Sequence, residues 1–215
     1  MIYSRYFSII ILAIAISACH STSKKNSEES DSKVKSIVLN DSVRNDLIIK
    51  GASISKQLAV VLQKNLKVAI KNEGFDYAID FCHNKAMILT DSVSRALGVN
   101  IKRVAKKYRN PFNATTQQES DLYKQYILDW LGNKPLKPQI ITDSDGHPVF
   151  YSLIKLNKKV CLNCHGTPGK ELPFKREMKI KKYYPDDAAI NFELGQPRGM
   201  WVITFPNYKI ADRER

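Results

Sequence analysis

Through the first half of the chain, apolar residues recur at intervals of three and four, which is the spacing of amphipathic helices. One such run covers about 43–72 and ends where Gly74 interrupts the pattern. A second run covers about 76–97, and the Gly98 that follows it is suited to end a helix. The sequence therefore predicts two consecutive helices, with Cys82 on the inward, apolar stripe of the second.

Weaker signals follow these helices. Apolar and basic residues alternate over 101–108, which predicts a strand, and R-N-P-F-N at 109–113 predicts a turn. Thr116 and Glu119 have the spacing of a capping box, so we expect a helix over about 117–131.

After Gly132 the spacing of apolar residues becomes that of strands. Segments 140–142 and 149–156 flank D-S-D-G, which predicts a hairpin. Segment 194–205 is expected to form another strand pair, bent near 195–199. Helices followed by an antiparallel sheet predict an α+β fold.

The N-terminus has the features of a bacterial export signal. Residues 1–18 contain Arg5 and an apolar core at 7–16, which is too short for a comfortable transmembrane helix. The signal ends in I-S-A-C at Cys19, which resembles a lipobox, although an ordinary signal peptide with an incidental cysteine is the alternative. We expect an exported lipoprotein, anchored to a membrane by lipid on Cys19 and facing the periplasm or the cell surface.

The rest of the chain divides into a linker and one domain. A polar stretch without hydrophobic period follows Cys19, and we assign 19–40 to a flexible tether. The segment 41–210 is long enough to bury a core as a single domain.

The sequence C-L-N-C-H contains Cys161, Cys164 and His165 in the spacing that attaches c-type haem. The two thiols add to the haem vinyl groups, and the histidine becomes an axial ligand of the iron. Haem c is attached on the outer side of the bacterial inner membrane, which agrees with the export signal. A zinc site would need two further ligands, and a thioredoxin-type pair would not be followed by the loop-like G-T-P-G. We therefore predict one covalent haem c.

The second axial position of the iron stays open on this evidence. Cys82 is the one cysteine without another explanation, although a buried free cysteine is by default a small hydrophobe. The further candidates are a lysine, no ligand, or one of His83, Met87, His147, Met178 and Met200.

Several separate motifs, in the same order, resemble the bacterial single-haem c-type cytochrome family with a PAS-like fold, long catalogued as a domain of unknown function. They are A-I-D-F-C-H-N-K-A at 78–86, G-V-N-I-K-R-V-A-K-K-Y-R-N-P-F-N at 98–113, Glu119, C-L-N-C-H-G at 161–166, Y-P-D-D-A-A from 184, and F-E-L-G-Q-P-R-G up to 199. The match spans about 45–206.

This resemblance implies a PAS-like antiparallel sheet with N-terminal helices. It also implies that His165 and Cys82 ligate the iron from opposite sides. His83 departs from the pattern as a neighbouring competitor, although on a helix it points about 100° away. A thiolate ligand favours ferric iron and lowers the reduction potential.

The chain is basic, with a formal net charge of +13. Such charge suits anionic lipid, an acidic redox partner or the haem propionates, and a solvated surface without a partner is the alternative. Nucleic acid is not expected outside the cytoplasm. Arg103 and Arg109 are candidates to bind the propionates, unless both are surface charges. The basic residues gather in two clusters, Lys102, Arg103, Lys106, Lys107 and Arg109, and Lys175, Arg176, Lys179, Lys181 and Lys182.

Three classes of function compete. An electron-transfer protein or redox-poised haem module is the preferred prediction, with a redox partner that the sequence does not identify. A redox or gas sensor would displace Cys82 and act through a partner protein, because the chain carries no output domain. A peroxidase-type enzyme needs an open iron face beside an acid–base group, which a Cys82 ligand would close, so we do not expect an enzyme.

Overall fold

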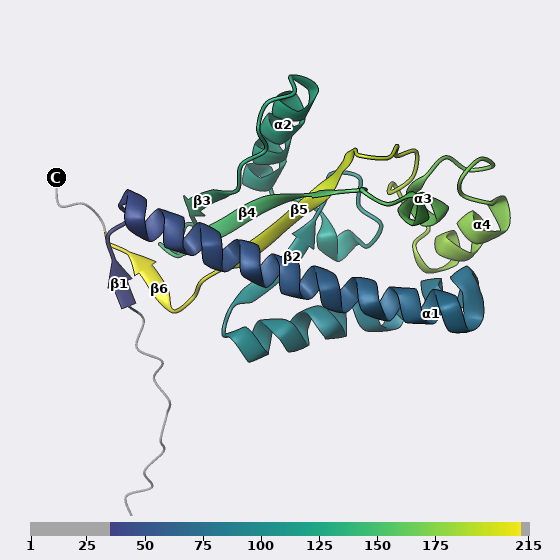
Figure 1. Ribbon diagram of the computed structural model, residues 1–215, viewed down its shortest axis with the longest axis horizontal. Helices are drawn as coiled ribbons and strands as arrows, with labels where there is room; N and C mark the ends of the chain where they lie inside the picture. The colour runs from purple at the N-terminus through teal and green to yellow at the C-terminus, as the bar shows by residue number, and fades with distance from the viewer. Residues whose placement is uncertain (1–34, 212–215) are drawn as a thin grey trace, which may run out of the picture. The chain divides into compact units, whose positions relative to one another are not determined.

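The structure, a computed structural model, describes residues 35–211 (Figure 1). The predicted signal peptide, Cys19 and most of the predicted tether lie outside this range. The described residues have helices and a four-stranded antiparallel sheet, which confirms the predicted α+β class. None of their helices is long and apolar enough to span a bilayer. In chain order the elements are β1 (Lys35–Ile37), α1 (Asp41–Leu97), β2 (Asn100–Val104), the 3₁₀ helix η1 (Pro111–Asn113), α2 (Gln117–Leu131), β3 (Gln139–Thr142), β4 (Pro148–Lys155), α3 (Lys159–His165), α4 (Phe174–Tyr183), β5 (Pro197–Thr204) and β6 (Tyr208–Ile210).

Both predicted N-terminal helices are present as the two halves of α1. The Asn40 side chain caps the first turn by accepting from the Val43 N–H at 2.9 Å. Gly74 separates the halves with φ 79° and ψ −175°, a conformation that favours glycine, and the second half reverses direction (Figure 1). Gly98 ends α1 in the left-handed conformation, with φ 61°.

The sheet has the order β2-β5-β4-β3, and every neighbouring pair is antiparallel. The predicted hairpin is confirmed, since β3 and β4 pair across a turn in which Gly146 N–H bonds to the Asp143 carbonyl. The strand pair expected over 194–205 is wrong. Gly195 has φ 87° within a turn, so only β5 forms, between β2 and β4.

The two faces of the sheet carry separate apolar clusters because successive strand residues point to opposite sides. On one face Phe150 and Ile203 pack with Leu58 of α1, and all three are fully buried. Gly51 of α1 permits this approach, since a Cβ there would lie 2.3 Å from Phe150 Cγ. On the other face Tyr126 of α2 packs against buried residues of three strands: Val104, Val149, Tyr151, Met200 and Val202.

Helix α2 has the predicted bounds and the complete Thr116–Glu119 capping box. Strand β1, helix α3 and helix α4 were not predicted from the sequence. Residues 35–37, which lie within the predicted tether, form β1 in parallel pairing with β6. Helix α4 has Ile180 as its one buried side chain, so few apolar residues mark it in the sequence. A small cluster of Ile79, Leu172 and Ile180 joins α4 to the second half of α1.

Candidate functional site

A cavity of about 370 Å³ lies among the two halves of α1, strand β2 and helix α3. Its walls are largely apolar, with Leu66, Phe75 and Ile79 among them. Within the range that the structure describes, every cofactor-binding residue named from the sequence lines this one cavity: Cys82, Arg103, Arg109, Cys161, Cys164 and His165.

Helix α3 carries Cys161 and Cys164, and their three-residue spacing puts both on the same side of the helix. The last carbonyls of a helix lack partners within it and need donors from elsewhere. Arg176 donates to the Asn163 carbonyl at 3.0 Å and Arg109 to the Cys164 carbonyl at 2.6 Å. The C-L-N-C-H segment is therefore held in place by two guanidinium groups.

His165 follows at the end of α3 with one ring nitrogen engaged. Its Nδ1 lies 2.8 Å from the Ala189 carbonyl, which can only accept, so Nδ1 carries the proton. Burial, with Arg198 and Arg109 nearby, holds the pKa of His165 well below its usual value. The imidazole is thus neutral, and the lone pair of Nε2 is available to a metal.

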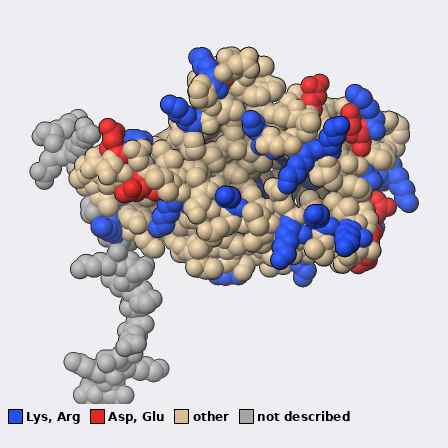
Figure 2. All heavy atoms as spheres, in the orientation of Figure 1, with Lys and Arg blue, Asp and Glu red and all other residues tan. Residues whose placement is uncertain are grey.

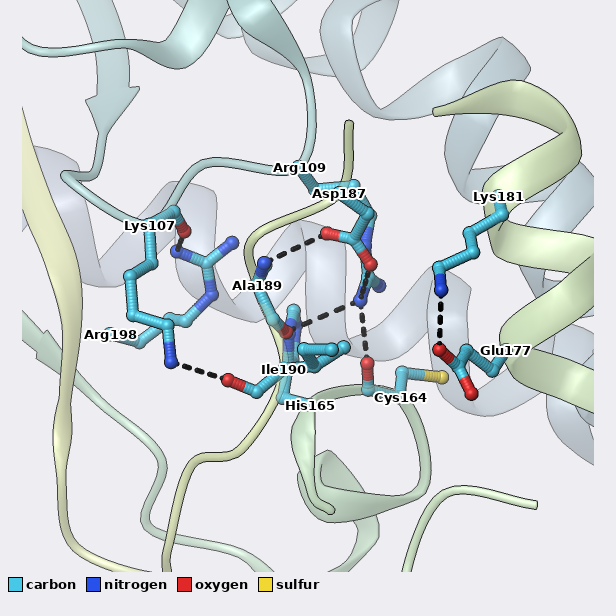
Figure 3. A network of polar contacts seen from close by, with 10 residues as sticks. All are labelled: Lys107, Arg109, Cys164, His165, Glu177, Lys181, Asp187, Ala189, Ile190 and Arg198. Atoms are coloured by element: carbon cyan, nitrogen blue, oxygen red, sulfur yellow. Dashed lines mark hydrogen bonds and ion pairs between the residues drawn. The ribbon is translucent and has the colours of Figure 1, made fainter. Parts of the chain in front are cut away.

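Arg109 belongs to a buried network that joins α3 to the loop before β5 (Figure 3). Its Nη2 lies 3.0 Å from Asp187 Oδ2, and Asp187 Oδ1 accepts from the Ala189 N–H at 2.9 Å. One guanidinium therefore fixes both Cys164 and the segment that holds His165. These contacts are within the protein, and binding of a propionate by Arg109 stays a prediction.

Two other arginines bring positive charge to the cavity. Arg103 has no side-chain hydrogen bond or ion pair with any described residue, and burial lowers its pKa. Arg198 donates from Nη1 to the Lys107 carbonyl at 3.0 Å, its buried Nε has no partner within residues 35–211, and burial lowers its pKa to about 10. Partly buried cations that form no ion pair are costly, so the cavity suits a ligand with anionic groups. Arg198 lies in the Q-P-R-G motif, but the sequence did not indicate a role for it, because only the fold brings it to the cavity.

Cys82 enters the cavity from the second half of α1. Its thiol makes no hydrogen bond with the described residues, and burial, with Cys164 close by, raises its pKa. Of the competing ligands His83 and Met87 also line the cavity. The His83 ring stacks on Tyr183 with centroids 4.2 Å apart, and its Nδ1 lies 3.0 Å from the Tyr184 hydroxyl. The remaining sequence candidates, His147, Met178 and Met200, do not line the cavity.

The donor set fits a haem better than a bare metal ion. Among residues 35–211, no three His, Cys, Asp or Glu side chains are grouped to hold a metal. The cavity instead combines apolar walls for a macrocycle, paired thiols for its vinyl groups, arginines for its propionates, and a thiol and an imidazole for its iron.

Comparison with known proteins identifies relatives of this chain. A family model described as Tll0287-like matches residues 27–206. The crystal structure of the cyanobacterial haem protein Tll0287 is similar, with a TM-score of 0.56 and 24% sequence identity, over 77% of this chain and 98% of that chain. No curated protein matches. At this identity the structural likeness establishes a shared fold.

Proposed function

Because the chain belongs to the Tll0287-like family, we propose that it binds one haem covalently and transfers electrons outside the cytoplasm. One observation carries the proposal: three cysteines and a histidine, from two segments far apart in the sequence, line one largely apolar cavity. The similar cyanobacterial protein is a haem protein by its title, which supports the same cofactor here.

Four residues would hold the haem. Cys161 and Cys164 would bind it through thioether bonds, and His165 would offer Nε2 to the iron, because its Nδ1 proton is committed to the Ala189 carbonyl. Cys82 would supply a second ligand as a thiolate. A bound haem would contribute one-electron chemistry. Burial raises the pKa of the Cys82 thiol, so the thiolate depends on the positive charge of the metal. Such ligation favours the oxidised state and lowers the potential.

Covalent attachment is tested by expressing the exported chain with c-type haem machinery. We expect haem-linked peroxidase staining on a denaturing gel, and its loss in the Cys161→Ala/Cys164→Ala variant. Full retention of stain by that variant would refute covalent attachment.

Axial ligation is tested by optical and EPR spectra of the ferric protein. We expect a low-spin thiolate signal that Cys82→Ala removes and the neighbouring control His83→Ala preserves. An unchanged spectrum in Cys82→Ala would indicate that His83 or Met87, and not Cys82, is the ligand. A high-spin wild type would reopen the enzyme hypothesis, which we reject because Cys82 would close the iron face.

Export and lipidation also belong to the proposal. Cys19→Ser should release the protein from membranes into the soluble fraction, as followed by fractionation and immunoblot. Persistent membrane association of this variant would refute the lipid anchor.

A further inference from the structure

The two basic clusters found in the sequence are largely engaged within the folded chain. In the first, Lys102 pairs with Glu119 at 2.6 Å, and Lys107 donates to the Ile190 carbonyl at 2.6 Å. In the second, three lysines have acidic partners: Lys175 with Asp76, Lys179 with Asp80, and Lys181 with Glu177. Lysines without an ion pair also lie elsewhere on the surface of the described residues.

Two other segments contain lysines without any acidic residue. Segment 47–72 has five lysines and segment 146–169 has three, and neither contains Asp or Glu. Among the described residues, none of these lysines forms an ion pair. The segments meet at the cavity, since Lys158 Nζ donates to Gln63 Oε1 at 2.6 Å and Gln63 lines the cavity.

Five of these eight lysines lie next to residues that line the cavity. On α1, Lys67 and Lys71 follow Gln63 at four-residue intervals and so share its face of the helix. On the other side, Val160 lines the cavity beside Cys161 and is 43% exposed. Figure 2 shows Lys and Arg side chains gathered around a hollow on the face toward the viewer. We call five exposed residues the lysine rim: Lys67, Lys71, Lys155, Lys158 and Lys159.

We propose that the lysine rim docks the acidic face of an electron-transfer protein, which then meets the cavity at Val160. This inference rests on the proposed function, because Cys161 beside Val160 is a proposed attachment point of the haem. Unpaired cations around a cofactor edge accelerate encounter with an acidic surface and repel a basic one. The small exposed apolar edge suits a transient interface, which in redox pairs buries less than about 1,200 Å².

The test uses oxidised plant-type ferredoxin, an acidic electron-transfer protein, as the probe. We expect chemical-shift changes in ¹⁵N-labelled haem-loaded protein that map to residues 63–71 and 155–161 at low salt. The affinity should fall at least tenfold at 0.5 M salt, where the Debye length is only a few ångströms. The Lys155→Glu/Lys158→Glu/Lys159→Glu variant should lose binding at least tenfold.

The matched control changes the same charge on elements that do not line the cavity, in Lys35→Glu/Lys137→Glu/Lys209→Glu. We expect this control to bind within about threefold of wild type, since screening weakens distant charges. An equal loss of ferredoxin affinity in both triple variants would show that only the net charge matters, and it would overturn the proposal that the lysine rim is the docking site. Shift changes confined to other surfaces would overturn it as well.

A lipid surface is a different occupant, and the same variants separate it. If the rim variant loses binding to phosphatidylglycerol vesicles but keeps its affinity for ferredoxin, the docking proposal is wrong. Haem staining is read independently of the shift map. If the protein stains for haem but the expected chemical-shift changes do not occur, docking alone is refuted. If the shift changes occur in a protein that does not stain for haem, the proposed function alone is refuted.

Discussion

Arg109→Met should destabilise the fold strongly, because Arg109 neutralises a buried carboxylate beside the attachment motif. The side chains of Arg109 and Asp187 are 18% and 2% exposed, and the same Nη2 binds the Cys164 carbonyl at 2.6 Å. Removing one partner of a buried ion pair costs about 3–5 kcal/mol. For a chain of this size, that corresponds to a fall in Tm of roughly 6–20 °C.

The assay is urea unfolding followed by tryptophan fluorescence, combined with a double-mutant cycle. Asp187→Asn added to Arg109→Met should recover part of the loss, because no charge is then left buried alone. Lys181→Met is the control, since it removes only an i,i+4 pair with Glu177 in which the lysine side chain is 44% exposed, and such helical pairs contribute about 0.3–0.5 kcal/mol. A loss in Arg109→Met no larger than in this control would refute the reasoning.

Three further predictions concern stability. Gly51→Ala should cost about 1–3 kcal/mol in urea unfolding although alanine favours helices, because its Cβ would lie 2.3 Å from Phe150 Cγ; a stabilised variant would contradict this packing. The hydrogen bond from Lys179 lowers the pKa of Asp80, so ionised Asp80 stabilises the folded state. This stabilisation is complete above the unfolded pKa of about 3.9 and is lost as pH falls through the folded pKa. Asp80→Asn should therefore flatten the acid side of a stability–pH curve, and an unchanged acid side would disprove it. Glu119→Gln should lower Tm less than Glu119→Ala, because glutamine keeps the bond to the Thr116 N–H; equal melting curves would exclude this role.

Local signals predicted the elements whose cause is local. Helix α2 begins where its capping box lies, and the hairpin of β3 and β4 follows from the turn at Asp143–Gly146, where glycine adopts φ 86°. The strand pair predicted over 194–205 was wrong because β5 pairs with β2 and β4, which come from distant parts of the sequence. Helix α4 was missed because its burial depends on contact with α1 through Ile180.

The sequence alone was enough to predict covalent haem attachment, since the spacing of Cys161, Cys164 and His165 is a property of one short segment. It also singled out Cys82, because the helical period placed that thiol on an inward face. The folded structure was needed to show which cations form no ion pair within residues 35–211. Ion pairs and carbonyl contacts join residues far apart in the chain, so charge runs in sequence do not reveal them. Contacts between residues far apart in the chain also bring Arg198 to the cavity and join Lys158, next to α3, to Gln63 of α1.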